Sequence, residues 1–220
     1  LVADSLGIQD YLKRKYNNHS KYIAYGADIF QEPSDKLLNE HHLESLGYNM
    51  LIARLEPENN IETILDGVAM ATTKQPFLVI GKYQGTKFGE YLVSKFKDHK
   101  HIRFLGGIYD QQALNNLRYY SNLYFHGHSV GGTNPSLLEA MASNTLIIAH
   151  DNPFNGSILK DHAFYFTKST DVQNYVDTLN KLNYLDKVEK CKAEITSNYS
   201  WDLINKQYLN YFEECYNNNK

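Results

Sequence analysis

The sequence predicts an α/β fold built on a mainly parallel sheet. Short apolar runs alternate with helical patterns, several of these runs are apolar at every position, and only a few residues connect one element to the next. Runs that are apolar throughout are typical of parallel strands buried on both faces, and regular alternation of strand and helix indicates right-handed crossover units. We therefore expect a doubly wound, Rossmann-like domain.

The individual elements follow from these patterns. The expected strands are short runs rich in aliphatic and aromatic residues; in chain order they are 21–25, 49–53, 77–81, 101–105, 122–126, 145–149 and 163–166. The expected helices repeat apolar residues every three or four positions; they are 61–72, 86–99, 110–120, 135–143, 171–182 and 201–216. Residues 1–20 and the last helix are expected to lie outside the sheet. No linker or repeat divides the chain.

The composition excludes several classes of protein. A chain of 220 residues, 42% of them hydrophobic, can bury a globular core, and no apolar run is long enough to span a membrane. The net charge of −3 argues against a nucleic-acid binder, because such proteins neutralise phosphates. Cys191 and Cys215 are too far apart for a CxxC motif, which favours a reducing, cytoplasmic setting. A dehydrogenase is not expected, since no GxGxxG follows the early strands.

The segment HGHSVGGTNPSLLEAM (126–141) has the features of a ligand site. Asn134 is a good helix N-cap and Pro135 suits the first helical position, so a helix begins there. Gly131 and Gly132 allow the backbone to turn and to approach a ligand closely. The N–H groups at the helix start can bind phosphate, and Glu139 can accept hydrogen bonds from two ribose hydroxyls. The alternative is an ordinary strand-to-helix turn in which Glu139 is solvated.

Five segments between residues 24 and 216 resemble one enzyme family in their order; they are AYGAD, MLIARLEPENNIETILDGV, HIRFLGGIYDQQALNNLRYYSNLYF, GGTNPSLLEAMASNTLIIA and SWDLINKQYLNYFEECY. They are similar to the carboxy-terminal, donor-binding half of retaining glycosyltransferases with the GT-B fold, of the group 1 (family four) type. The two segments GHSVGGTNPSLLEAM and ARLEPENNIE are most similar in sequence to the corresponding segments of rhamnosyltransferase-like enzymes of bacterial polysaccharide synthesis. The resemblance implies transfer of a sugar from a nucleotide-diphosphate donor to a saccharide or lipid-linked acceptor in O-antigen or capsule synthesis.

The resemblance also implies roles for individual residues. Arg54 matches the arginine that contacts the donor diphosphate, and its planar guanidinium suits that role, although a surface ion pair is the alternative. Glu139 matches the glutamate that holds the nucleotide ribose. These two residues are also the candidates for catalytic residues, and no nucleophile is assigned. The stretch from Gly132 through Thr133 to Asn134 matches the backbone that wraps the sugar and the phosphates.

Further residues are expected around the donor. Ile108 and Tyr109 match the positions on which the base rests, although Tyr109 could equally be a half-exposed loop residue. His128 is expected to be a polar group near the donor; together with His126 it forms an H-x-H pattern, but no third ligand is spaced to complete a zinc site. Lys82, which follows the 77–81 strand, is another candidate phosphate contact.

Two positions depart from the family pattern. Gly131 stands where the family has a glutamate that meets the donor sugar, so recognition of the sugar must differ here. Asn59 stands where the family has a lysine beside the diphosphate, which removes one cation from the site. Asn59 and Asn60 could instead be caps of the helix that starts near Ile61.

At the level of domains, the resemblance implies that residues 1–20 contain the end of the acceptor-side domain and a hinge helix. Residues 21–200 would form the donor-binding domain, and residues 201–220 the C-terminal helix. The acceptor would be held by an N-terminal domain outside this chain, so the chain alone should be inactive. No cofactor is expected: the substrate is a dTDP-, UDP- or GDP-linked sugar and catalysis is metal-independent.

The resemblance implies a cytoplasmic enzyme and allows peripheral association with the inner face of the membrane. Two other functions stay open at this point. One is a non-catalytic nucleotide-binding domain, which the departures at Gly131 and Asn59 favour. The other is a fragment of a nucleotide-sugar epimerase with the same two-domain architecture.

Overall fold

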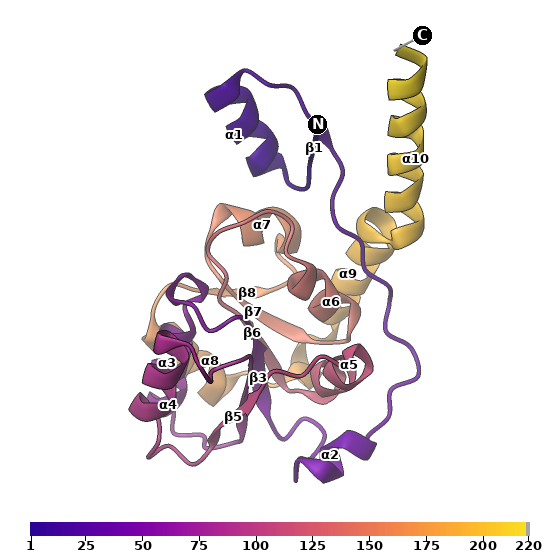
Figure 1. Ribbon diagram of the computed structural model, residues 1–220. Coiled ribbons are helices and arrows are strands. Elements are labelled where there is room, and N and C mark those ends of the chain that lie inside the picture. Colours follow the sequence, from indigo (N-terminus) through magenta and orange to yellow (C-terminus); the bar gives the residue numbers. More distant parts are fainter. Residues whose placement is uncertain (219–220) are drawn as a thin grey trace.

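A six-stranded parallel sheet forms the centre of the molecule in the computed structural model, which describes residues 1–218 (Figure 1). The strand order is β5-β4-β3-β6-β7-β8, and every neighbouring pair is parallel. The strands are β3 (Asn49–Ile52), β4 (Phe77–Ile80), β5 (Ile102–Gly106), β6 (Leu123–His126), β7 (Leu146–His150) and β8 (Phe164–Phe166). The predicted α/β, Rossmann-like fold is confirmed.

Helices cover both faces of this sheet (Figure 1). The helices that follow β3 in the chain are α3 (Ile61–Met70), α4 (Lys87–Lys95), α5 (Gln111–Tyr120), α6 (Pro135–Ala142), α7 (Pro153–Leu159), α8 (Ser169–Thr178), α9 (Leu185–Glu194) and α10 (Trp201–Asn218). Apolar residues of α3, α4 and α8 pack on one face of the sheet, and those of α5 and α6 pack on the other. Neighbouring strand residues divide between the faces, so Met50 belongs to one core and Leu51 to the other. Burial on both faces explains why these runs are apolar throughout.

The predicted strand 21–25 is wrong as part of the central sheet. Only Lys21–Tyr22 (β2) is a strand, and it pairs in parallel with Val2–Ala3 (β1) in a separate two-stranded sheet. Ile23 and Ala24 are buried against the core on the α5 and α6 side of the sheet. The apolar pattern of this run therefore reflects burial rather than strand pairing.

Most predicted helices are present, with ends shifted by a few residues. Helix 171–182 is α8, which begins and ends earlier than expected, and a short 3₁₀ segment over Lys181–Tyr184 follows it. The helical patterns did not predict α2 (Lys36–Glu40), α7 or α9. The first two are five and seven residues long, too short for a helical repeat to be evident.

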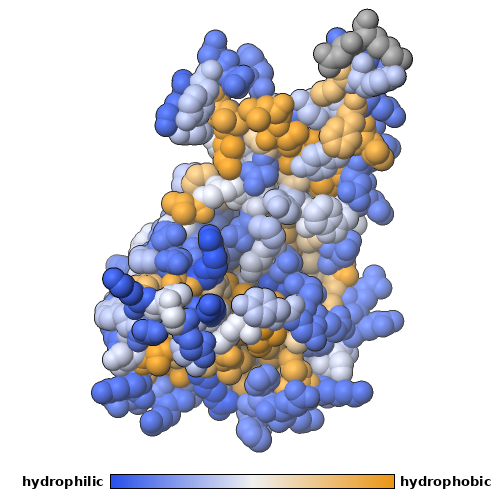
Figure 2. All heavy atoms as spheres, in the orientation of Figure 1, coloured by the Kyte–Doolittle hydropathy of each residue, from blue (hydrophilic) through white to orange (hydrophobic). Residues whose placement is uncertain are grey.

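The N-terminal segment and the last helix lie outside the central sheet (Figure 1). Helix α1 (Leu6–Tyr16) is capped by Ser5, whose hydroxyl accepts a hydrogen bond from the Ile8 N–H at 3.1 Å. None of the residues of α1 is buried. Hydrophobic side chains gather between α1 and α10 (Figure 2). Both helices carry exposed large apolar residues, among them Leu6 on α1 and Leu209 and Phe212 on α10.

Candidate functional site

The candidate site lies where the order of the strands reverses. β3 and β6 are neighbours in the sheet, but the chain leaves them in opposite directions, toward β4 and toward β7. Ligands of open α/β sheets bind beyond the carboxyl ends of the strands at such a point. A cavity of about 510 Å³ opens there, between the loops that follow β3 and β6.

The cavity is lined by most of the residues that the sequence singled out. They are Arg54, Asn59, His128, Gly131, Gly132, Thr133, Asn134 and Glu139. Ile108 and Tyr109 line an adjoining cavity of about 330 Å³ instead, which shares Arg54 with the first. The structure thus brings Arg54, the 131–134 loop and Glu139 together, as the sequence led us to expect. Their roles in binding stay predictions.

Arg54 is held in place by the asparagines that follow it. The side-chain amide of Asn59, only 3% exposed, donates to the Arg54 carbonyl at 2.8 Å. The amide of Asn60 donates to the Gly127 carbonyl at 2.8 Å and so ties this loop to the one after β6. Asn60 occupies the N-cap position of α3 but makes no side-chain cap bond, and Asn59 is not a cap. Asn59 borders the cavity mainly as the residue that fixes the Arg54 backbone.

Two glycines let the loop after β3 pass between its neighbours. A Cβ on Gly81 would collide with the Ala53 carbonyl, and a Cβ on Gly127 would collide with the Asn59 carbonyl. Both collisions would be with backbone atoms, which cannot turn away as a side chain can. The close approach of these three loops therefore depends on glycine at both positions.

Two histidines stack at the end of β6. The ring centroids of His126 and His128 are 4.4 Å apart and their planes differ by 16°. Burial, and then the neighbouring positive charge of Arg54, lowers the pKa of His128 to about 4. Burial also holds the pKa of His126 well below its usual value. Both rings are therefore neutral at pH 7, and among residues 1–218 neither ring nitrogen of His126 has a hydrogen-bond partner.

The glycine pair before α6 serves two different purposes. Gly131 has a φ of +125°, a conformation that favours glycine. The missing Cβ of Gly132, by contrast, leaves room for Asp4, because a Cβ there would collide with the Asp4 carboxylate. This corrects the expectation that Gly132 leaves its space to a ligand. The Thr133 hydroxyl donates to the Asp4 carbonyl, so the N-terminal segment is docked on this loop.

Helix α6 begins as predicted. The Asn134 side chain caps it by accepting a hydrogen bond from the Ser136 N–H at 2.9 Å, and Pro135 is the first helical residue. Within residues 1–218, the main-chain N–H groups of Gly131, Gly132 and Thr133 donate no hydrogen bond. They are available, next to the positive end of the helix dipole, for an anion.

Glu139 forms an ion pair with a buried arginine, so it is not simply solvated, and one of its two carboxylate oxygens is already bound. Its Oε2 pairs with the guanidinium of Arg118 at 2.7 Å, and Arg118 is only 1% exposed. Arg118 also donates to the Asn115 side chain at 2.8 Å. The sequence did not predict the ion pair between Glu139 and Arg118. The available signal was the position of Arg118 four residues after Leu114, on the buried face of α5.

Tyr109 is much more exposed than a half-exposed loop residue, at 87%. Ile108 is partly buried against the core, on the same loop after β5. Lys82 and Thr86, from the loop after β4, complete the lining of this adjoining cavity. This adjoining cavity offers an apolar wall and an exposed aromatic ring beside Arg54, which also lines the cavity of the 131–134 loop.

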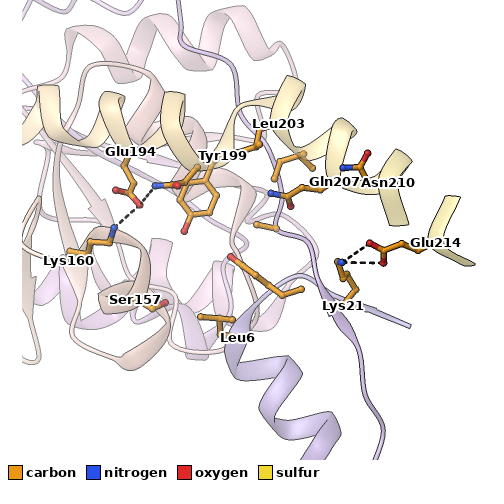
Figure 3. Close-up of a pocket in the computed structure, with 14 residues that line it drawn as sticks. Leu6, Lys21, Ser157, Lys160, Glu194, Tyr199, Leu203, Gln207, Asn210 and Glu214 are labelled. Atoms are coloured by element: carbon orange, nitrogen blue, oxygen red, sulfur yellow. Dashed lines mark hydrogen bonds and ion pairs between the residues drawn. The ribbon is translucent and has the colours of Figure 1, made fainter. Parts of the chain in front are cut away.

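Another cavity, of about 600 Å³, lies elsewhere (Figure 3). It is formed by α1, β2, α7, the end of α9 and α10, not by the loops after β3 and β6. Its charged residues pair with one another: Lys160 with Glu194 at 2.8 Å, and Lys21 with Glu214 at 3.3 Å.

Two further observations concern the part of the chain that the structure describes. In residues 1–218, no group of three or more His, Cys, Asp and Glu side chains is placed to hold a metal ion. Over the same residues, no helix combines the length and the apolar character needed to cross a membrane.

Solved structures resemble this chain closely in fold. HepE from Anabaena, in complex with UDP and glucose, matches with a TM-score of 0.85 at 17% identity, over 97% of this chain and 62% of that chain. Sucrose-phosphate synthase from Thermosynechococcus elongatus matches with a TM-score of 0.81 at 16% identity, over 98% and 58%. A glycosyltransferase from Rickettsia africae matches with a TM-score of 0.80 at 14% identity, over 97% and 62%. This chain thus spans about three fifths of the length of these neighbours.

A search of curated proteins gives no match. The sequence model of one family, by contrast, covers residues 30–198, which include the whole central sheet and the lining of the candidate cavity. With the fold shared with the glycosyltransferases above, this places the chain in the family of Glycosyl transferases group 1.

Proposed function

We propose that this chain is the donor-binding domain of a retaining glycosyltransferase and that a nucleotide-diphosphate sugar occupies the cavity at the ends of β3 and β6. The observation that carries the proposal is the convergence of Arg54, the 131–134 loop and Glu139 on one cavity at the strand reversal. Three sequence segments that lie far apart meet there, each with the chemistry that one part of the donor needs.

The diphosphate fits between Arg54 and the start of α6. Arg54 supplies a permanent positive charge, and the N–H groups of Gly131, Gly132 and Thr133 supply donors beside the helix dipole. In transfer, negative charge grows on the diphosphate as the bond to the sugar breaks. Donors fixed in advance around that position stabilise this charge, so we propose that no metal ion is required.

The nucleoside fits on the α5 side of the cavity. The Glu139 oxygen that Arg118 leaves unoccupied can accept a hydrogen bond from a ribose hydroxyl. The base would extend to the adjoining cavity and rest against Ile108 and the exposed ring of Tyr109. Neutral His128 lines the cavity beside Arg54 and can donate or accept a hydrogen bond there.

The neighbours and the sequence refine the proposal. HepE was solved with UDP and with UDP-glucose, which supports a uridine diphosphate sugar as the first donor to test. The amino-acid sequence of residues 127–141 supports a rhamnosyltransferase-like enzyme of bacterial O-antigen or capsule synthesis. The acceptor, a saccharide or a lipid-linked saccharide, would be held by a second domain, with the enzyme in the cytoplasm at the inner face of the membrane.

The test is binding of nucleotides to the 220-residue chain. Thermal shift and calorimetry with UDP, GDP and dTDP should show one preferred diphosphate. Arg54→Ala should weaken its binding by about 1.5–3 kcal/mol, the scale of hydrogen bonds to a charged group. Lys97→Ala, which removes an exposed cation beyond the end of α4, is the matched control and should bind normally. No binding of any of the three diphosphates would refute the proposal.

A further inference from the structure

The loop that would surround the donor sugar carries no acid of its own. Residues 130–134 read Val-Gly-Gly-Thr-Asn, so they contribute no carboxylate to the cavity that they line. Sugars present hydroxyl groups, and a carboxylate is a strong acceptor for them because a hydrogen bond to a charged group is stronger than one between neutral groups. If this loop is to bind a sugar through a carboxylate, the carboxylate must come from another part of the chain.

Asp4 brings a carboxylate to this loop from the far end of the sequence. A Cβ on Gly132 would collide with both oxygens of the Asp4 carboxylate, so this group lies directly over the Gly132 Cα. The Asp4 main chain is anchored on the same loop, because its carbonyl accepts a hydrogen bond from Thr133, 129 positions away. The preceding residue, Ala3, is buried and paired with β2.

The Asp4 carboxylate has no partner among the described residues. Within residues 1–218 its side chain makes no hydrogen bond and no ion pair, although the residue is partly buried. A carboxylate removed from part of its water loses solvation that a hydrogen-bond donor would restore. Asp4 lines neither the 510 Å³ cavity nor the hollow lined by Ser5 and Leu6, but its carboxylate lies against Gly132, which borders both.

We propose that Asp4 accepts a hydrogen bond from a hydroxyl of the donor sugar and thereby determines which sugar nucleotides bind. This inference rests on the proposed function, because it takes the diphosphate to lie against the 131–134 loop. The sugar follows the diphosphate and then meets the carboxylate over Gly132. Since Asp4 would touch the sugar and not the nucleotide, its contribution should appear only with donors that carry the sugar.

The variant Asp4→Ala distinguishes a contact with the sugar from a contact with the nucleotide. The probes are UDP with UDP-glucose, GDP with GDP-mannose, and dTDP with dTDP-rhamnose, each titrated into the full 220-residue chain. For the pair of ligands that the wild-type chain binds, Asp4→Ala should weaken the affinity for the sugar nucleotide by about tenfold. The affinity for the bare diphosphate should stay within about twofold of the wild-type value. The variant should fold, because the bond from Thr133 goes to the main chain of Asp4.

Two further variants make the experiment selective. Gly132→Ala should lower the same affinity ratio, since its Cβ would displace the Asp4 carboxylate, and adding Asp4→Ala to it should change little. Asp10→Ala on the exposed side of α1 removes a nearby charge without touching the loop and should leave the ratio unchanged. Equal loss for both ligands, or no loss for either, would overturn the role of Asp4 and leave the proposed function standing. Failure of the wild-type chain to bind any diphosphate would overturn both.

Discussion

At the scale of single residues, the ion pair between Glu139 and Arg118 changes how the site must be tested. Arg118 is almost fully buried, and Glu139 is the only carboxylate paired with it among residues 1–218. A variant that removes Glu139 therefore leaves a buried positive charge without its partner. A loss of nucleotide binding in such a variant could come from movement of Arg118 as well as from loss of a ribose contact.

We expect Glu139→Ala to lower the free energy of unfolding by about 1–3 kcal/mol, because breaking a buried pair costs more than breaking an exposed one, and Glu139 is itself one third exposed. Urea denaturation measures this change. The double variant Arg118→Met/Glu139→Ala should recover part of the loss, since no unpaired charge remains. An unchanged stability of Glu139→Ala would show that Arg118 does not depend on the pair.

The buried histidines give the stability a dependence on pH. The pKa of His128 is about 4 in the folded chain and 6.5 in the unfolded chain, so the unfolded chain takes up a proton first as the pH falls. The stability that comes from a neutral His128 is thus complete above pH 6.5 and is lost as the pH falls toward 4. His126 acts in the same direction, because its pKa is also lowered.

The expected size of this effect for His128 is about 2 kcal/mol between pH 7 and pH 5. The measurement is the free energy of unfolding in urea at both pH values, for the wild-type chain and for His128→Asn. The difference between the two pH values should shrink by that amount in the variant, while the contribution of the carboxylates stays the same. Equal pH dependence in both chains would contradict a neutral, buried His128.

At the scale of elements, the position of Arg54 depends on how the loop after β3 is enclosed. The loop passes between Gly81 and Gly127, and Asn60 links it to the loop after β6. Arg54 is therefore presented by a loop fixed on both sides, and the cost of binding a diphosphate there includes little ordering of the backbone.

Gly127→Ala should destabilise the chain by about 1–3 kcal/mol, because the new methyl group meets the Asn59 carbonyl and the backbone must move. It should also weaken diphosphate binding, since Arg54 is on the displaced loop. The matched control is Gly156→Ala in α7, where a Cβ meets no atom within 4 Å. That change should be neutral or should stabilise the helix by up to about 1 kcal/mol. Stability equal to the wild type for Gly127→Ala would show that the loop is not enclosed in this way.

The sequence predicted the strands of the central sheet and the longer amphipathic helices, and it missed the short helices α2 and α7. Runs such as 77–81 are apolar at every position because sheet and helices enclose them, so the pattern alone identified them. The run at 21–25 has the same pattern but packs against the core without joining the sheet. The contact of Asp4 with Gly132 joins distant parts of the chain and leaves no local pattern, and the spacing of Arg118 from Leu114 indicated burial of Arg118 but not its pairing with Glu139. Arg54 and Glu139, by contrast, could be placed from the strand end and from the helix cap.

At the scale of the whole molecule, two helices present apolar side chains to solvent. Helix α1 buries none of its residues, α10 exposes Leu209 and Phe212, and hydrophobic side chains gather between the two helices (Figure 2). A patch of this kind is typical of a surface that packs against another protein or domain. Under the proposed function, this is where an acceptor-binding domain would pack.

The chain by itself should bind nucleotide diphosphate without transferring sugar. Binding needs Arg54, the start of α6 and the loop after β5, whereas transfer also needs an acceptor held in place and water excluded. Because Gly131 and Asn59 replace a glutamate and a lysine of the family pattern, we expect a Kd of roughly 10–1000 μM, equivalent to about 4–7 kcal/mol. Turnover of labelled nucleotide sugar with candidate acceptors is the measurement. Robust formation of glycosylated product would show that no second domain is needed.

The strand reversal that positions the cavity also has a consequence for folding. One half of the sheet, β5-β4-β3, comes from residues 49–106, and the other, β6-β7-β8, comes from residues 123–166. Among residues 1–218, the pairing of β3 with β6, as in Asn49 with Leu123, is the only strand pairing between these halves, and on one face α3 packs against α8 across it. Contacts close in sequence form faster than distant ones, so each half should assemble before this seam closes. The cavity lies on the seam, and a chain with two folded but separate halves would therefore have no binding site.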